Sequence, residues 1–396
     1  MLMDVSAPQY QNLSAVQPSA ENAGFFLPLE SLRGVAALVV VVYHAIWINP
    51  VTGLRFFQNG ALMVDFFFVL SGFVICHSYG ARLAGLRDFG RFMWLRFGRL
   101  YPLHFAFLIV FLAIEFAKYF AQVRYGIVAD KPAFTVNGAG AFWENVFLVQ
   151  ALSFTAPLTY NYPSWSISVE FCAYTLFAVT RIISGRGAGL VVASIIIVAV
   201  SAAALLIGGK WSLADSGNGW ALFRCCGGFF LGVLTYYTYC QLAPRTPSES
   251  PSRALDAWIA PAVLIATIIF LSSELTQAWS FLLPVLGAGI ILTTVAYPNR
   301  ILVRLLSCKP LTWLGRVSYS TYMVHAAIVW TVTQWLTLIM KVPRVQIGED
   351  SFVATSPGLG LLTFALYMAL VLVVSHFTFT WIEDPFRKKA RRLYAM

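Results

Sequence analysis

Apolar residues occur along this chain in long runs, not in the one-sided patterns of a soluble domain. The cleanest run, LVVASIIIVAVSAAALLIG at 190–208, has 19 residues, enough to cross a hydrocarbon core of about 30 Å at about 1.5 Å per residue. Because backbone groups in lipid must be satisfied within the segment, such spans are helical. The pattern predicts an all-α membrane protein with ten spans, at 29–48, 61–79, 100–121, 161–180, 188–208, 220–240, 256–272, 279–297, 317–338 and 358–381.

Composition agrees, with 59% hydrophobic and 11% charged residues and a mean hydropathy of +0.73, which excludes a soluble globule. The net charge is +10, but its distribution argues against nucleic acid as a partner. With both termini cytoplasmic, 18 of the 27 Lys and Arg residues fall on the cytoplasmic side, seven fall outside and two lie within spans. The positive-inside rule therefore favours this orientation. The six cysteines lack metal-ligand spacing and are expected to be buried small hydrophobes.

The chain divides into three parts. Residues 1–28 contain neither Lys nor Arg and no apolar run, so they are expected to form a disordered cytoplasmic tail, not a secretory signal. Residues 29–386 form the transmembrane domain, and 387–396 form a basic cytoplasmic tail. The Pro- and Ser-rich stretch 241–253 is expected to be an exposed cytoplasmic linker, and 122–160 is the longest outer connection.

Arg33 and His44 bracket ten residues of the first span, nine of them apolar. Eleven steps of about 100° bring both side chains to one helix face, with about 16 Å between them along the axis. Ionisable groups within a bilayer are costly and mark functional pathways. Two plainer interpretations stay open: Arg33 extends to the lipid headgroups, or His44 makes only a structural hydrogen bond.

Asp65 in the second span is expected at a depth close to that of His44. A carboxylate there would hold the imidazole in one tautomer, as in a general-base pair. The alternative is that Asp65 caps its own helix. Ser71 and Gly72 in the same span would allow another helix to approach closely.

Arg96 and Arg99 are three residues apart and share a helix face at the cytoplasmic boundary. Paired guanidinium groups suit the phosphates of a nucleotide-containing donor, although topology signalling alone also explains them. Ser166 and Glu170, four residues apart, share a face of the fourth span, where a buried acid must be protonated or paired. His325 lies near mid-membrane in the ninth span, where an interhelical hydrogen bond is the plainer explanation.

Six segments of the chain occur in a recognisable order: LESLRGVAALVVVVYH, MVDFFFVLSGFVI, RFGRLYP, WSISVEF, SYSTYMVH and IEDPFRK. From about residue 30 to 390 the chain resembles the acyltransferase-3 family of integral-membrane O-acyltransferases. The resemblance implies a ten-helix bundle in the bacterial inner membrane. It also implies transfer of an acyl group, often acetyl, from cytoplasmic acyl-CoA to a hydroxyl, commonly on a surface or exported glycan.

The family's basic residue, spacer and histidine match Arg33 and His44, its paired arginines match Arg96 and Arg99, and its acid after Trp-Ser matches Glu170. With the positions described above, the expected catalytic residues are His44, Asp65 and Glu170, and the expected substrate-binding residues are Arg33, Arg96, Arg99, Trp165, Ser166 and His325, with no metal.

The chain departs from the family pattern twice. Met63 stands where Gly usually precedes Val-Asp, which implies altered packing around Asp65. Phe171 stands where a second acid often follows Glu170, which leaves that residue without a companion acid. Some relatives carry an extracellular hydrolase-like domain; here a second transfer step is expected to need a separate protein.

The expected function is transfer of an acyl group, with acetyl expected, from acyl-CoA as donor substrate, without a permanently bound cofactor. The partners are the bilayer, a glycan acceptor and glycan-assembly proteins; a macrolide-like metabolite or a small glucan are rival acceptors. Either His44, oriented by Asp65 or Glu170, is the general base, or His44 accepts the acyl group covalently. A proton-coupled exporter of sugars or small metabolites and a non-catalytic partner in glycan assembly are the alternatives.

Overall fold

The computed structural model describes residues 27–129, 131–154, 157–214, 217, 219–242, 256–297, 300–348 and 350–393. Its main helices are α2 (Leu27–Tyr43), α4 (Met63–Tyr79), α5 (Leu86–Tyr125), α7 (Trp165–Ser184), α8 (Ala188–Ile207), α9 (Trp220–Leu242), α10 (Asp256–Leu271), α11 (Leu282–Ala296), α13 (Lys309–Gln334) and α14 (Pro357–Thr378). Shorter elements are α3 (Arg55–Gln58), η2 (Gly60–Leu62), α6 (Ala139–Val146), η3 (Tyr162–Ser164), η5 (Glu274–Thr276), α12 (Arg300–Leu306), η6 (Trp335–Ile339), β1 (Arg344–Ile347), β2 (Asp350–Val353), η7 (Phe379–Glu383) and α15 (Asp384–Leu393).

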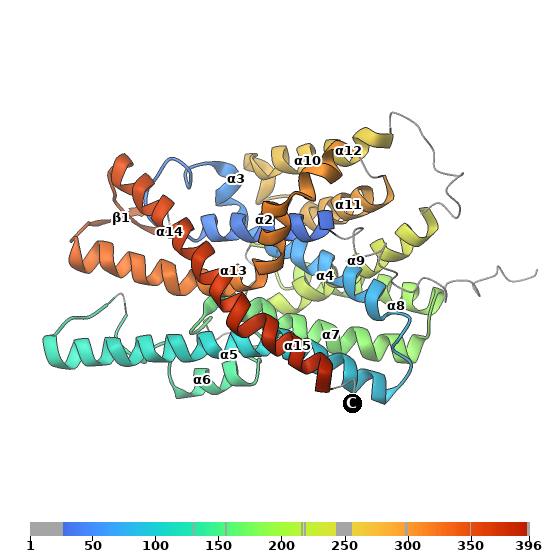
Figure 1. The fold of residues 1–396 in the computed structure, drawn as a ribbon, viewed down its shortest axis with the longest axis horizontal. Coiled ribbons are helices and arrows are strands. Elements are labelled where there is room, and N and C mark those ends of the chain that lie inside the picture. The colour runs from blue at the N-terminus through green and yellow to red at the C-terminus, as the bar shows by residue number, and fades with distance from the viewer. Residues whose placement is uncertain are drawn as a thin grey trace, which may run out of the picture.

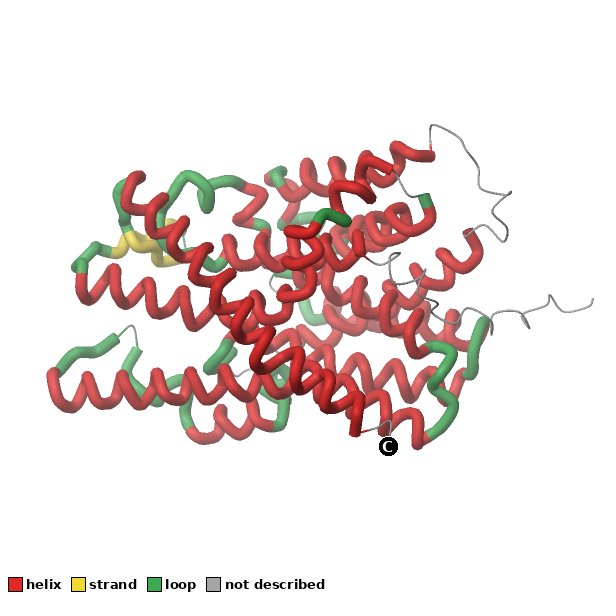
Figure 2. The backbone as a smooth tube through the Cα atoms, viewed as in Figure 1, coloured by secondary structure: helices red, strands yellow, loops and turns green. Residues whose placement is uncertain are grey.

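The protein is a mostly helical, multi-pass membrane protein, as the apolar pattern predicts. Many of its long helices run along the long axis of the molecule, while α14 and α15 cross them obliquely (Figures 1 and 2). In the described part of the chain, 6 helices are long and apolar enough to cross a membrane. The count of ten spans and the orientation of the termini stay predictions. The predicted tail 1–28 and linker 241–253 lie almost wholly outside the described residues.

Helix α5 is much longer than the predicted span 100–121. It has 40 residues and continues through Pro102 without a break, which gives a length of about 60 Å. The extension is at its N-terminal end, where arginines recur along the sequence. Arg96 and Arg99 therefore lie on the same continuous helix as the apolar span, which fixes their positions against the helices packed around it.

The first helix is shorter than predicted, because α2 ends at Tyr43 and not near residue 48. The following residues are extended and bond to a β-hairpin that the apolar pattern does not predict. Strands β1 and β2 pair antiparallel, and Val353 of β2 forms a bridge with Trp47. The N–H of Ile48 donates to the Val353 carbonyl at 3.0 Å. His44 is thus fixed from both sides, by the end of α2 and by this contact.

Glycines allow two helix pairs to pack at very short distance. A Cβ atom at Gly34 of α2 would lie 2.6 Å from the Gly315 nitrogen of α13. A Cβ atom at Gly72 of α4 would collide with the Phe229 carbonyl of α9. The prediction that Gly72 allows close helix approach is therefore confirmed. These contacts set α2, α4, α9 and α13 around a common interior, where the polar residues of the bundle gather.

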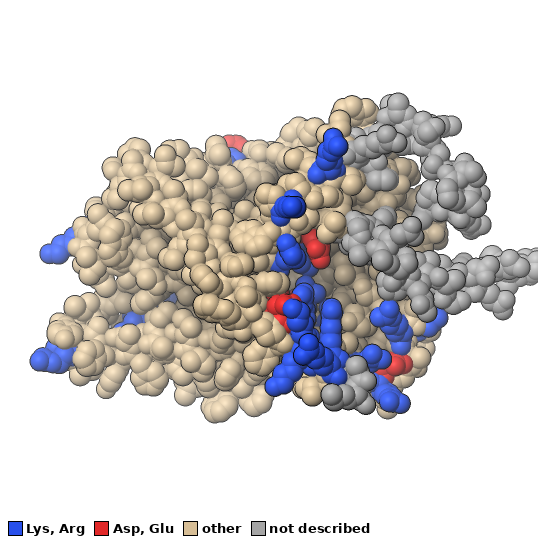
Figure 3. Space-filling model, viewed as in Figure 1, with Lys and Arg blue, Asp and Glu red and all other residues tan. Residues whose placement is uncertain are grey.

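Lys and Arg side chains gather on the end of the molecule that carries α15, with few on the opposite end in the same view (Figure 3). The predicted basic tail 387–396 is helical as far as Leu393. A hydrogen bond fixes it to α5, because the Trp94 Nε1–H of α5 donates to the Ala390 carbonyl at 3.2 Å. The two ends of the bundle therefore differ strongly in charge.

Candidate active site

A cavity of about 130 Å³ opens between α2, α4, α5, α7 and α13. We call it the arginine cavity. It is lined by Arg33, Val64, Phe67, Phe68, Leu70, Ser71, Val74, Ile75, Arg96, Arg99, Leu100, Ser166, Ile167, Glu170, Tyr174, Ser318, Tyr319 and Tyr322. Five residues that the sequence selects as candidates, Arg33, Arg96, Arg99, Ser166 and Glu170, come from three different helices and share this one cavity. Asp65, His44, Trp165 and His325 are not among its lining residues.

Arg33 is held by α13 and does not extend toward lipid headgroups. Its Nε–H donates to the Ser318 hydroxyl at 2.9 Å, and its Nη2 donates to the Gly315 carbonyl at 2.8 Å. This reach depends on the close approach of the two helices at Gly34 and Gly315. The headgroup interpretation of Arg33 is therefore wrong, and the guanidinium is fixed at the wall of the cavity.

Arg96 and Arg99 share a helix face as expected, but their surroundings differ. Arg96 donates to the Tyr79 hydroxyl at 2.9 Å and lies over the rings of Tyr79, at 5.0 Å, and Phe92, at 5.9 Å. Arg99 makes no hydrogen bond or ion pair with any described residue. A guanidinium that lines a cavity and keeps its donors unused is suited to bind an anionic group.

Glu170 faces the arginine cavity and accepts two hydroxyl donors. The Ser71 hydroxyl and the Tyr174 hydroxyl each lie 2.6 Å from its Oε1. Phe171 occupies the position of the companion acid in the family pattern, so these hydroxyl groups supply the polar partners instead. Ser71 thus has a polar role in addition to the helix packing expected for it.

His44 and His325 are direct neighbours, which the sequence does not reveal. The His44 Nδ1 lies 2.9 Å from the Val40 carbonyl and 3.2 Å from the His325 Nε2. The His325 Nδ1 lies 2.7 Å from the Tyr322 carbonyl. Since a carbonyl only accepts, we assign the proton of each ring to Nδ1. The Nε2 of His44 then carries a lone pair, and no described residue hydrogen-bonds to it.

Asp65 does not orient His44, contrary to the argument from depth. Its two carboxylate oxygens accept from Arg224, at 2.8 Å from Nε and 2.7 Å from Nη2. The guanidinium of Arg224 also lies 5.4 Å from the centre of the Trp165 ring. Because this bidentate pair occupies the carboxylate, Asp65 is a structural partner of Arg224, and Trp165 packs against that pair. The orientation of His44 comes from Val40 and His325.

Tyr322 connects the arginine cavity with the histidine pair. Its side chain lines the cavity, and its ring centre lies 5.7 Å from that of His325. Its hydroxyl donates to the Pro163 carbonyl at 2.8 Å and accepts from Ser166 at 3.0 Å. Ser166 therefore positions a tyrosine that stands between the cavity and the histidine pair. Sequence reasoning missed Tyr322, although Ser318, Tyr322 and His325 follow one another at helical spacing in α13.

A second cavity, of about 270 Å³, lies on the other side of the histidine pair. We call it the outer cavity. It is lined by Phe111, Ile114, Glu115, Lys118, Lys131, Pro132, Thr135, Val136, Asn137, Leu158, Tyr160, Tyr162, Ala326 and Trp330. The ring of Tyr162 lies 5.3 Å from that of His44. Lys118 is 19 residues beyond Arg99 on α5, about 28 Å along the helix axis. The two cavities thus lie toward opposite ends of the molecule.

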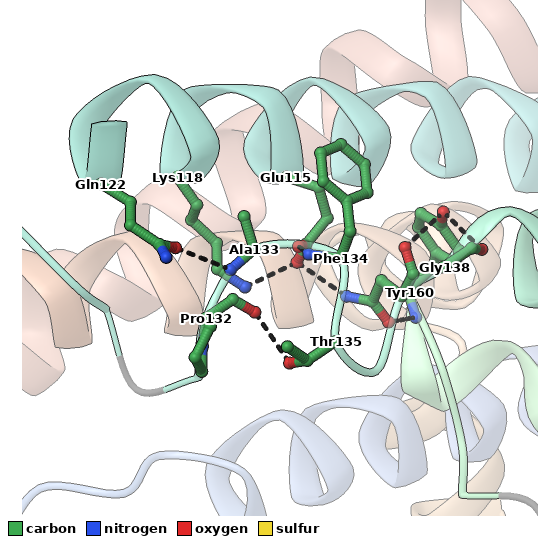
Figure 4. A network of polar contacts seen from close by, with 10 residues as sticks. Glu115, Lys118, Gln122, Pro132, Ala133, Phe134, Thr135, Gly138 and Tyr160 are labelled. Atoms are coloured by element: carbon green, nitrogen blue, oxygen red, sulfur yellow. Dashed lines mark hydrogen bonds and ion pairs between the residues drawn. The ribbon is translucent and has the colours of Figure 1, made fainter. Parts of the chain in front are cut away.

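Glu115 organises the wall of the outer cavity (Figure 4). Its Oε1 accepts from Lys118 at 2.7 Å and from Asn137 at 2.9 Å, and its Oε2 accepts from the Phe134 N–H at 2.7 Å. The Tyr160 hydroxyl donates to the Asn137 carbonyl at 2.8 Å. Burial, with a contribution from Glu115, raises the pKa of Tyr160, so the phenol stays protonated and keeps this bond. The segment that carries Phe134 and Asn137 is therefore fixed against α5 and forms an ordered wall of the outer cavity.

Comparison with known proteins agrees with this architecture. A family model described as an acyltransferase domain matches residues 28–379. The chain belongs to the acyltransferase-3 family. Peptidoglycan O-acetyltransferase OatA of Listeria monocytogenes is 23% identical over 387 residues, 91% of this chain and 55% of that protein. O-acetyltransferase OatA of Staphylococcus aureus is 22% identical over 394 residues, 93% of this chain and 58% of that protein.

BcsY of Komagataeibacter xylinus carries the name of a membrane-bound transacylase. It is 26% identical over 304 residues, which are 75% of this chain and 71% of that protein. The chain spans little more than half the length of the OatA proteins that it matches. No solved structure matches the chain. The family match covers all five helices that line the arginine cavity, so the cavity belongs to the shared domain.

Proposed function

We propose that the protein is an O-acyltransferase of the bacterial inner membrane. It moves an acyl group, expected to be acetyl, from cytoplasmic acyl-CoA to a hydroxyl of a surface or exported glycan. Family membership and the names of the relatives support acyl transfer. The unused donors of Arg99 in the arginine cavity support an anionic donor substrate, and both OatA relatives are named for O-acetylation.

The observation that carries the proposal is the contact of the His44 Nδ1 with the Val40 carbonyl. The carbonyl of Val40 holds the proton on Nδ1, which leaves Nε2 free to take a proton from an acceptor hydroxyl. The hydroxyl oxygen then forms a bond to the thioester carbonyl carbon, and the C–S bond breaks. The CoA thiolate takes the proton from His44, so the products are an ester and CoA thiol.

The donor and the acceptor reach His44 from different sides in this scheme. Arg33 and His44 are eleven residues apart on α2, about 16 Å, so a long flexible arm has to carry the thioester past Tyr322. The acceptor enters through the outer cavity, where aromatic rings and polar side chains surround Tyr162. A glycan fits such a lining, because rings pack on sugar faces and polar groups bind hydroxyls.

Covalent acylation of His44 uses the same lone pair and is the second chemical route. In that route Nε2 forms a bond to the thioester carbonyl carbon, the C–S bond breaks, and the CoA thiolate takes a proton from water. The acceptor oxygen then takes the acyl group, the C–N bond to Nε2 breaks, and the proton of the acceptor hydroxyl returns to the hydroxide left in the first step. The routes differ when the acceptor is omitted. Covalent transfer gives one equivalent of CoA thiol per protein in a single rapid phase, whereas direct transfer gives none.

The test is release of CoA thiol from acetyl-CoA by the purified protein in lipid, with and without soluble cell-envelope glycans. We expect glycan-stimulated release, and a decrease of at least about 100-fold in His44→Ala, as for loss of a general base. His376→Ala is the matched control, because this exposed histidine of α14 lines neither cavity. Full activity of His44→Ala, or no release with any donor and glycan extract, would overturn the proposal.

A further inference from the structure

A third cavity, of about 370 Å³, lies at the basic end of the molecule, beside the arginine cavity. We call it the surface cavity. It is lined by Tyr79, Arg82, Leu83, Asp88, Arg91, Phe92, Leu95 and Arg391. These residues come from the end of α4, the connection after it, the start of α5 and the C-terminal helix α15. Neither the sequence motifs nor the proposed chemistry assigns it a role.

The lining combines positive charge with aromatic rings. Three guanidinium groups, of Arg82, Arg91 and Arg391, face a single carboxylate, that of Asp88. The Asp88 Oδ2 already accepts the Ala84 N–H at 3.0 Å. Three arginines from separate segments converge on one cavity, whereas orientation in the membrane requires only that they lie on the same side. An excess of guanidinium beside aromatic rings suits a ligand with phosphate groups and a planar base.

The position of Arg391 is built into the fold. Helix α15 packs directly on α5 at Gly98, where any Cβ atom would collide with Ala390. The Trp94 indole N–H also donates to the Ala390 carbonyl. Arg391 follows Ala390 in sequence, so these two contacts hold its backbone at the edge of the surface cavity.

The surface cavity and the arginine cavity share a wall. Tyr79 and Phe92 line the surface cavity, and Arg96, which lines the arginine cavity, packs against both rings. Arg91 and Arg99 lie eight residues apart on α5, about 12 Å. A ligand in the surface cavity therefore lies one layer of side chains from the arginine cavity.

We propose that the surface cavity binds the adenosine 3′,5′-bisphosphate end of acyl-CoA through Arg82, Arg91 and Arg391, and that the acyl-bearing arm passes Arg96 into the arginine cavity. This inference rests on the proposed function, because it assigns a second part of the same donor. It divides the donor between the cavities: the nucleotide occupies the surface cavity, and Arg99 meets the part that enters the bundle. It also gives the C-terminal helix a role in substrate binding.

The experiment compares binding of CoA and 3′-dephospho-CoA to the full chain in nanodiscs of zwitterionic lipid. The two ligands differ by one phosphate, so the ratio of their dissociation constants reports the site of that phosphate. We expect CoA to bind about tenfold more tightly in wild type, equivalent to about 1.4 kcal/mol. The ratio should fall to near one in at least one of Arg82→Gln, Arg91→Gln and Arg391→Gln.

Arg392→Gln is the matched control, since Arg392 is an exposed neighbour that does not line the cavity, and its ratio should equal that of wild type. A ratio unchanged in all three cavity variants, with CoA still bound, overturns this inference and leaves the proposed function standing. No binding of CoA or acetyl-CoA to wild type overturns both.

A phospholipid headgroup offers the same phosphate chemistry as CoA. Changing the lipid composition of the nanodiscs distinguishes these two occupants of the surface cavity. If the cavity serves anionic lipid, adding phosphatidylglycerol to the nanodiscs should weaken CoA binding in wild type by several-fold, and the three variants should bind CoA as wild type does without that lipid. That pattern also overturns the inference. If the cavity serves the donor, the three variants lose CoA affinity in zwitterionic lipid alone.

Discussion

Arg224 and Arg99 are both arginines inside or beside the helix bundle, yet their surroundings are opposite. The side chain of Arg224 is only 4% exposed, and Asp65 occupies its guanidinium with two hydrogen bonds. Arg99 lines a cavity and has no hydrogen bond or ion pair with the described residues. A charge whose partners are complete serves the fold, whereas a charge with unused donors at a cavity is available to a ligand. The sequence shows two arginines; only the contacts separate their roles.

The largest expected effect comes from breaking the ion pair between Asp65 and Arg224. Arg224→Met leaves the Asp65 carboxylate buried without a partner, so the free energy of unfolding should fall by about 3–5 kcal/mol. Titration with SDS in mixed micelles measures this change. Adding Asp65→Asn to the same chain should restore most of the loss, and Arg304→Met, at an exposed site of α12, is the control. A loss below about 1 kcal/mol would mean that the pair is not structural.

At Arg99 we expect the opposite: a change in donor binding and none in stability. Arg99→Gln should raise the KM for acetyl-CoA by about 10–100-fold, the value of one or two charge-assisted hydrogen bonds, without changing the free energy of unfolding. Initial rates of CoA release at varied donor concentration give this number. Arg316→Gln, at an exposed site of α13, should leave KM unchanged. A lower free energy of unfolding in Arg99→Gln would mean that Arg99, like Arg224, serves the fold.

The histidine pair tests whether the orientation of the His44 ring affects activity as much as the charge of Arg99 does. In His325→Gln the His44 ring keeps its bond to Val40 but loses the neighbouring ring, so kcat should fall about tenfold while KM for the donor stays the same. A purely structural role for His325 would instead lower the unfolding temperature and leave kcat per folded protein unchanged. Both quantities come from one preparation, by initial rates and by fluorescence-monitored thermal unfolding.

The smallest effect is expected at Ser71, which supplies one of two hydroxyl bonds to Glu170. Ser71→Ala leaves the Tyr174 bond in place, so kcat/KM should fall only about two- to fivefold, equivalent to about 0.4–1 kcal/mol. Ser194→Ala is the control, because this buried hydroxyl donates to the Leu190 carbonyl of its own helix and does not line the cavity. A decrease above about 50-fold would show that the two hydroxyls do not act independently on Glu170.

Much of this site follows from the sequence, because its residues belong to local motifs or violate the apolar pattern. Arg33, Arg96, Arg99, Ser166 and Glu170 are identified in that way, and the structure brings them to one cavity. The membrane class and the helical fold follow from the length of the apolar runs.

The pairings do not follow, because they join residues far apart in the chain. Asp65 and Arg224 are separated by 159 positions, and His44 and His325 by 281. Depth along a helix axis gives one coordinate of a side chain, whereas a partner also requires the direction in which it points. Asp65 and His44 match in predicted depth, but the side chain beside His44 is the ring of His325 on α13.

Helix α5, at about 60 Å, is roughly twice as long as a hydrocarbon core is thick. With a tilt near the usual 20°, about half of it must stand outside the hydrocarbon. Its N-terminal half carries Arg91, Arg96 and Arg99, so these groups lie where water and lipid headgroups meet. An ionised ligand bound there exchanges water for guanidinium donors and does not have to enter the hydrocarbon. Only the uncharged thioester arm continues into the bundle, and it is the part of the donor that loses least when it sheds water.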